Sequence, residues 1–392
     1  MTGATRAALL AHTVLVQSVT FVLRPTATYR AIELEVPALW LGVLSASFAV
    51  APLLLAVPSG QAVDRLGERR VMVAGALLLC ASAATFLLFG HAVAGLVAAS
   101  VVLGTGHLCS VVGQQALVAN NSPAHKYDAA FGYYTFAASL GQALGPGLIF
   151  AFGGDRTIPH TGAIFAGAAA LTAVPLVAAL LLPRTARRPA SESSAQSGVR
   201  ELLRRPGLLR ALTVSCVVLA AVDITLVYLP ALGAERGIAS GAIGALLTLR
   251  AVTSMASRLF LGRLAAALGR RRLLVGSVAL SAASLAVMPV PLPLWALAVA
   301  VAVAGLGLGA GQPLTMSWLA ESAPPGMRGR AMSLRLTGNR AGQVLLPSAA
   351  GLLAAGTGAA GVLAVTAAGL AAVGVAARRL HQNPPTGGEN RA

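Results

Sequence analysis

Charged side chains are confined to short segments between long apolar runs, and this feature restricts the possible folds more than any other. Residues 39–57 and 71–89 carry no charge, whereas the twelve residues 59–70 between them carry five charges. A run of about 20 apolar residues is long enough to cross a bilayer as a helix. The chain is 56% hydrophobic and only 10% charged, which leaves too little polar surface for a soluble globule. We therefore predict a polytopic membrane protein.

Apolar runs bounded by charges or by Pro/Gly clusters predict an all-α protein with twelve transmembrane helices. Several landmarks recur 201 residues apart, and this repeat predicts two pseudo-symmetric six-helix bundles. The recurring pairs are Gly104 and Gly305, Pro123 and Pro324, Gly141-Gln142 and Gly342-Gln343, and Pro146 and Pro347. The expected organisation is an N-terminal bundle (1–183), a Ser/Arg-rich linker (184–207), a C-terminal bundle (208–380) and a tail (381–392).

The positions of the basic residues predict the orientation in the membrane. If both termini are cytoplasmic, the outer loops hold only Arg30, Arg156 and Arg236, and most of the 29 lysines and arginines, Arg335 among them, fall in inner loops and tails. This asymmetry is typical of a protein of a bacterial-type inner membrane with both termini inside. It also accounts for the net charge of +17 without a nucleic-acid partner.

Few charges lie deep in the predicted helices, and these are the candidate functional residues. Asp223 is the only deep acid. Burial opposes the ionised form of a carboxylate, and a nearby arginine favours it. We therefore expect Asp223 to carry a proton; the alternative is a permanent salt bridge to Arg250 or Arg24 that only specifies packing. Arg24 ends a polar helical stripe that includes Gln17 and Thr20. The other deep candidates are Arg250, Arg340 and His107, the last as a possible proton relay; Arg258 is expected to extend to the membrane surface.

The pattern Gly-x-x-x-Asp-Arg-x-Gly-x-Arg-Arg over residues 60–70 resembles the signature loop of the major facilitator superfamily. The resemblance implies a gating role for this loop, in which an acidic residue holds the two halves together on the cytoplasmic side. The residues concerned are Gly60, Asp64, Arg65, Gly67, Arg69 and Arg70, with Arg328 and Arg330 as candidate partners.

A second stretch, with Gly132, Gly141, Gly145 and Pro146, is similar to the antiporter signature of the same superfamily. Glycines at these spacings also suit simple helix packing. The stretch departs from the family pattern at its end, where Ile149-Phe150 stand in place of two glycines. Ser100 likewise stands where the family has an arginine tied to proton transfer.

The resemblance implies alternating access, with Arg24 and Asp223 facing a central cavity and Arg250, Arg340 and Gln343 at the seam between the halves. We expect a secondary transporter similar to bacterial proton-coupled efflux permeases, which exports a small organic solute. Uptake or exchange of an organic or inorganic anion is the alternative within transport, and a non-transporting sensor or scaffold is the alternative outside it. The expected partners are the bilayer and the solute, and the expected state is a monomer. The sequence shows no enzyme constellation, metal site or cofactor motif, so the proton gradient is the expected driving force.

Overall fold

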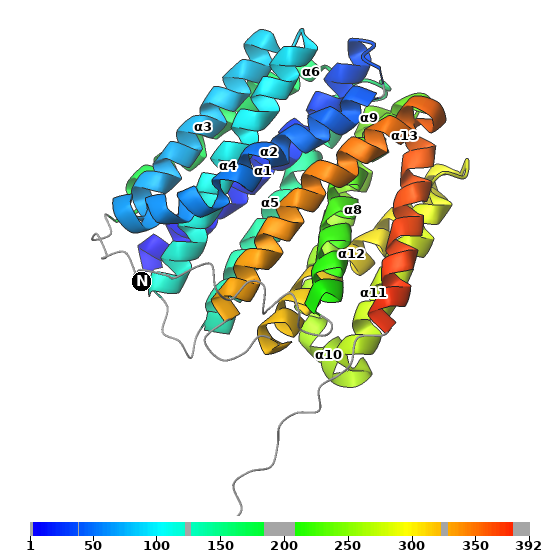
Figure 1. The fold of residues 1–392 in the computed structure, drawn as a ribbon. Helices are drawn as coiled ribbons and strands as arrows, with labels where there is room; N and C mark the ends of the chain where they lie inside the picture. The colour runs from blue at the N-terminus through cyan, green and yellow to red at the C-terminus, as the bar shows by residue number, and fades with distance from the viewer. Residues whose placement is uncertain (1–2, 38, 122–126, 184–207, 323–327, 379–392) are drawn as a thin grey trace, which may run out of the picture.

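The computed structural model describes residues 3–37, 39–121, 127–183, 208–322 and 328–378 (Figure 1). These residues form helices joined by short turns, without a strand among them. The predicted linker and tail lie outside the described residues. The helices are α1 (Gly3–Glu33), α2 (Leu39–Leu66), α3 (Glu68–Phe89), α4 (Val93–Asn121), α5 (Tyr127–Gly153), α6 (Thr161–Leu181), α8 (Leu208–Glu235), α9 (Ser240–Leu259), α10 (Leu261–Leu268), α11 (Arg270–Val287), α12 (Leu294–Ser322) and α13 (Arg328–Arg378).

Glycines with positive φ mark the sharp changes of direction. Gly67 (φ 86°) separates α2 from α3, and Gly269 (φ 78°) separates α10 from α11 at the equivalent place in the second half. Gly358 (φ 65°) breaks α13 into two consecutive helices. Because glycine has no Cβ, it adopts this conformation without strain. The two halves of the chain therefore turn at matching positions.

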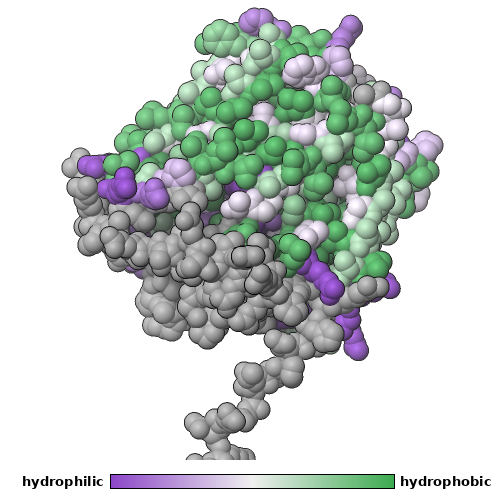
Figure 2. All heavy atoms as spheres, in the orientation of Figure 1, coloured by the Kyte–Doolittle hydropathy of each residue, from purple (hydrophilic) through white to green (hydrophobic). Residues whose placement is uncertain are grey.

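The outer surface is apolar, as a membrane protein requires. Leu54, Leu181 and Trp295 are each more than 70% exposed, and the face in Figure 2 carries a broad apolar surface. Within the described residues, nine helices are long and apolar enough to span a bilayer, and the bent pair α9–α10 makes a tenth. The arginines at the start of α11 and within the first part of α13 make these two segments less apolar. Together with α11 and the first part of α13, the described residues provide the twelve predicted transmembrane helices. The predicted fold class is confirmed.

The two halves have the same internal packing. In the first half, Gly104 of α4 lies against the Phe48 carbonyl of α2, and Gly141 of α5 lies against Val14 of α1. In the second half, the equivalent Gly305 of α12 lies against the Arg250 carbonyl of α9. Gly342 of α13 likewise lies against Cys216 of α8. Small residues allow such close approach of helix backbones, so the 201-residue repeat in the sequence is a repeat of helix contacts.

The halves meet through α2 with α13, α5 with α9, and α1 with α8. Close approaches between the halves lie near the end of the bundle where α1 ends and α2 begins. A Cβ on Gly42 of α2 would lie 2.6 Å from the Gly351 Cα of α13, and one on Gly153 of α5 would lie 2.6 Å from the Gly241 N of α9. The Ser240 N–H also donates to the Arg156 carbonyl at 2.6 Å. The described residues therefore hold the halves together at this end, which we call the closed end.

Candidate transport site between the halves

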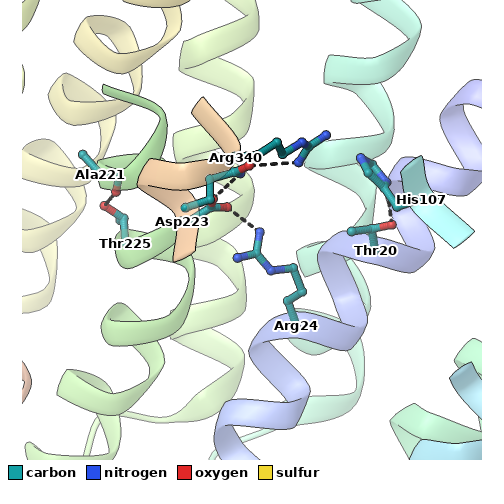
Figure 3. A network of polar contacts seen from close by, with 8 residues as sticks. Thr20, Arg24, His107, Ala221, Asp223, Thr225 and Arg340 are labelled. Carbon is teal, nitrogen blue, oxygen red and sulfur yellow. Dashed lines mark hydrogen bonds and ion pairs between the residues drawn. The ribbon is translucent and has the colours of Figure 1, made fainter. Parts of the chain in front are cut away.

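An ion pair joins the two halves in the middle of the bundle. Arg24 of α1 donates from Nη1 to Asp223 Oδ1 of α8, and Figure 3 shows the two side chains pointing toward one another. Both residues are buried, with Arg24 7% and Asp223 4% exposed. α1 continues as a helix through Pro25, which keeps the arginine on the face toward α8. The ion pair fits both roles expected for Asp223, because an ionised proton carrier and a permanent partner of an arginine make the same contact.

The second oxygen of Asp223 is also occupied. Gln343 of α13 donates from Nε2 to Asp223 Oδ2, and its Oε1 accepts a hydrogen bond from Arg340 Nη1 at 2.9 Å. Residues three apart on a helix lie on the same face, so α13 presents an amide and a guanidinium together. Arg340 and Gln343, which the family resemblance assigned to the seam, thus belong to the same network as Arg24 and Asp223.

Aromatic and hydroxyl groups complete the first-half side of the network. The Arg24 guanidinium lies over the Phe48 ring, 4.4 Å from its centroid, a favourable cation–π geometry. The Phe48 and His107 ring centroids are 5.5 Å apart, and His107 Nδ1 is 3.1 Å from Thr20 Oγ1. No hydrogen bond among the described residues links His107 directly to Asp223.

Arg250 of α9 is the least satisfied charge in the described part of the chain. It is 2% exposed, and its Nε and Nη2 atoms have no hydrogen-bond partner among the described residues. Its guanidinium interacts electrostatically with the Asp223 carboxylate and with Arg24 and Arg258. Arg24 Nη2 is likewise buried without a described partner. A buried cationic N–H without an acceptor is costly, so this region has unused hydrogen-bond donors.

Gln17 lies apart from this network. It is buried, its Oε1 has no described partner, and its Cβ lies against Gly141 of α5. The stripe on α1 therefore divides between neighbours: Gln17 contacts α5, Thr20 contacts α4, and Arg24 contacts α8.

The signature loop is only partly described. The side chains of Asp64, Arg328 and Arg330 lie outside the described residues, so their expected contact remains a prediction. Arg65 and Arg70 are exposed, and Arg69 Nη2 donates to the Leu180 carbonyl at 2.6 Å. A Cβ on Gly60 would meet no described atom within 4 Å, and the gating role expected for this loop stays a prediction.

The glycines of α5 serve helix packing. Gly141 and Gly145 lie against backbone atoms of Val14 and Ser18 of α1, and Pro146 is accommodated within the helix. The surroundings of Gly132 lie outside the described residues. The contacts of Gly141 and Gly145 join two helices of the same half.

Several polar contacts were not anticipated. Arg258 donates from Nη1 to Ser139 Oγ of α5 at 2.8 Å and from Nε to the Gly309 carbonyl at 3.3 Å, so it crosses the seam instead of extending to the membrane surface. Arg335, counted with the inner loops, is a buried residue of α13 and lies 3.4 Å from Ser215 Oγ. In the first half, His12 Nδ1 lies 2.8 Å from Gln114 Nε2. Arg335 and Gln343 are spaced so that both lie near one face of α13. This spacing was the signal in the sequence that could have predicted a buried polar face there.

Residues 9–236 and 212–392 match the Major Facilitator Superfamily. The chain belongs to this superfamily. The nucleoside transporter NupG has the same fold, with a TM-score of 0.80 at 13% identity over 96% of this chain and 100% of that one. A D-xylose–proton symporter gives 0.77 at 16% identity over 96% and 97% of the two chains. This chain thus has the family and the fold of a major facilitator superfamily protein.

A shorter match links this major facilitator protein to the quinolone resistance protein NorA of Staphylococcus aureus. The two are 31% identical over 108 residues, which cover 28% of this chain and 28% of NorA.

Proposed function

We propose that the chain is a proton-coupled secondary transporter, which moves a small organic solute across a bacterial-type inner membrane by alternating access. The observation that carries the proposal is the buried Arg24–Asp223 ion pair, which joins the two halves in mid-bundle. Ionisable residues inside a membrane are expensive and typically mark ion or substrate pathways.

The proposed cycle uses the ion pair as the link between protonation and movement of the halves. Superfamily members alternate by rocking one bundle against the other around a central site. While Asp223 is ionised, its two oxygens attach α8 to Arg24 of α1 and to Gln343 of α13. A proton on Asp223 removes its negative charge and weakens the contact to Arg24. His107, near Arg24 through Thr20 and Phe48, is the second candidate for proton movement.

Orientation and direction are also part of the proposal. With both termini in the cytoplasm, the closed end faces outward. The partial antiporter motif in α5 and the short match to NorA support export, whereas the similarity in fold to a proton symporter supports symport. The three arginines around one aspartate favour a second candidate, the uptake or exchange of an anion. We propose that the monomer is the working unit, with the proton gradient as its energy source and no cofactor.

The test is proton movement in proteoliposomes that contain the purified protein and an internal pH dye, with organic anions and lipophilic cations as candidate solutes. Wild type should show proton flux when a suitable solute is added, and Asp223→Asn should lose it. Asp155→Asn is the matched control, because Asp155 is exposed and outside the network. Undiminished flux in Asp223→Asn would make the ion pair structural. Absence of flux with every compound would favour a sensor or scaffold.

A further inference from the structure

One carboxylate is the counter-charge for three guanidiniums at the interface between the halves: Arg24 is paired with it directly, and Arg250 and Arg340 interact with it electrostatically. Arg24 and Arg250 also have N–H groups without a described partner. Arg24, Arg250 and Arg340 carry a formal charge of +3, against −1 for Asp223, among the described residues of this network. Buried positive charge of this excess attracts anions and repels cations. The substrate class can therefore be argued from this site.

The network also shows which anionic group fits. The Asp223 carboxylate places one oxygen on Arg24 Nη1 and the other on Gln343 Nε2. A planar group with two acceptor oxygens is thus the shape that these donors recognise. Asp223 leaves Arg24 Nη2 and two Arg250 nitrogens unpartnered, so a second carboxylate would find donors that are already desolvated.

We infer that the transported solute carries a carboxylate, which binds the N–H groups of Arg24 and Arg250 and replaces Asp223 as the partner of Arg24 when Asp223 takes up a proton. The inference rests on the proposed function and favours its second candidate. The proton comes from the medium and goes onto the Asp223 carboxylate, and no covalent bond to the solute forms. One negative charge enters as another is neutralised, so the network keeps its net charge.

The exchange links proton and solute binding in the same direction. The charged groups that interact with Asp223 are Arg24 from α1, Arg340 from α13 and Arg250 from α9. Arg258 of α9 interacts with Arg250, and His107 of α4 interacts with Arg24 and Arg340. The described residues of α12 whose side chains are placed include no charged one. Because guanidiniums hold their protons tightly, Asp223 is the member of this described network that exchanges a proton when the solute binds. Proton and carboxylate then travel together, as in symport.

The experiment is equilibrium binding to the purified full-length protein, measured by scintillation proximity with radiolabelled benzoate and succinate as probes. Benzamide and succinamide compete as neutral isosteres, and phosphate competes as an inorganic anion. We expect both carboxylates to bind at least about tenfold more tightly than their amides, the order of one charged hydrogen bond. Wild-type affinity should rise as pH falls from 8 to 6, by at most about tenfold per pH unit for one linked proton.

Three variants locate the effect. Asp223→Asn should bind benzoate without pH dependence, and at least as tightly as wild type at pH 6, because its side chain is neutral at every pH. Arg250→Gln should weaken binding by about 10- to 100-fold. Arg258→Gln is the matched control, because it removes a buried seam guanidinium whose Nε and Nη1 already have acceptors, and it should bind within about threefold of wild type. Size-exclusion profiles check that each variant is folded, and the wild-type pH series needs no variant.

Equal binding of amide and carboxylate, binding of phosphate alone, or no binding of any probe would overturn the inference. A pH-independent wild-type affinity would overturn the exchange at Asp223. Solute-driven proton flux with an uncharged or cationic compound would leave the proposed function standing without this inference. Carboxylate binding with the predicted pH dependence but no transport would support the inferred binding site and contradict the proposed function.

Discussion

The Arg24–Asp223 pair predicts an unequal cost for removing its two members. Asp223→Asn leaves Arg24, Arg250 and Arg340 around a neutral amide, with no counter-charge in the described network. Removal of one partner of a buried ion pair costs about 3–5 kcal/mol. Arg24→Gln leaves Asp223 with the Gln343 hydrogen bond and with the favourable field of two remaining arginines. We expect its cost to be less than half as large.

The assay is thermal unfolding in detergent, followed with a thiol-reactive dye, because Cys80, Cys109 and Cys216 are free and half-buried. An unfolding entropy of about 2.1 cal/mol/K per residue converts 3–5 kcal/mol into a fall in Tm of about 4–6 °C for Asp223→Asn. Arg24→Gln should fall by about 2 °C or less by the same conversion. The double variant should lose less than the sum, because the two residues interact directly. Equal losses, the reverse order or simple additivity would refute the reasoning.

Three further results are expected. Gly351→Leu should prevent the halves from meeting at the closed end, because a Cβ there would lie 2.6 Å from the Leu39 carbonyl. Spin-label distances across that end should therefore lengthen. Gly162→Ala, with open space around it, should leave these distances unchanged. Ser139→Ala removes the acceptor of Arg258 Nη1 and should cost on the order of 2 kcal/mol in thermal unfolding; an unchanged Tm would show that this seam contact adds no stability. His107→Gln should retain proton-driven transport within about threefold. The reason is that the described hydrogen bond of His107 is to Thr20, and a single neutral hydrogen bond is worth about 1 kcal/mol. Loss of proton flux in this variant would make His107 the proton carrier.

The fold could be predicted from the sequence because hydrocarbon enforces a simple pattern. In hydrocarbon, a long uncharged run must be helical, because a helix satisfies its own backbone hydrogen bonds. The 201-residue repeat indicates that the chain contains two copies of one helix bundle. Gly104 and Gly305 illustrate this point, since each allows the same close contact in its own half. The bend between α9 and α10 could not be placed, because apolar composition does not fix bends.

The site could be predicted in its members but not in its contacts. Asp223 and Arg24 stand out as charges in apolar helices, yet their pairing depends on how α1 and α8 are rotated, which only packing decides. The bond from Gln343 to Asp223 could not be predicted, because the expectation followed helix number and not helix face. Arg335 was misassigned to a loop because a charge near a helix end resembles a loop charge. The burial of Arg250 without an acceptor has no signal in the sequence.

The central claim is that Asp223 couples proton movement to solute movement, and the most direct test separates these two steps in one variant. Asp223→Asn is reconstituted in proteoliposomes with a solute that drives proton flux in wild type. Solute exchange at equal pH and solute accumulation driven by a pH gradient are then measured in the same preparation. The account predicts that exchange persists while proton-driven accumulation is lost. Accumulation at the wild-type level in Asp223→Asn would contradict it.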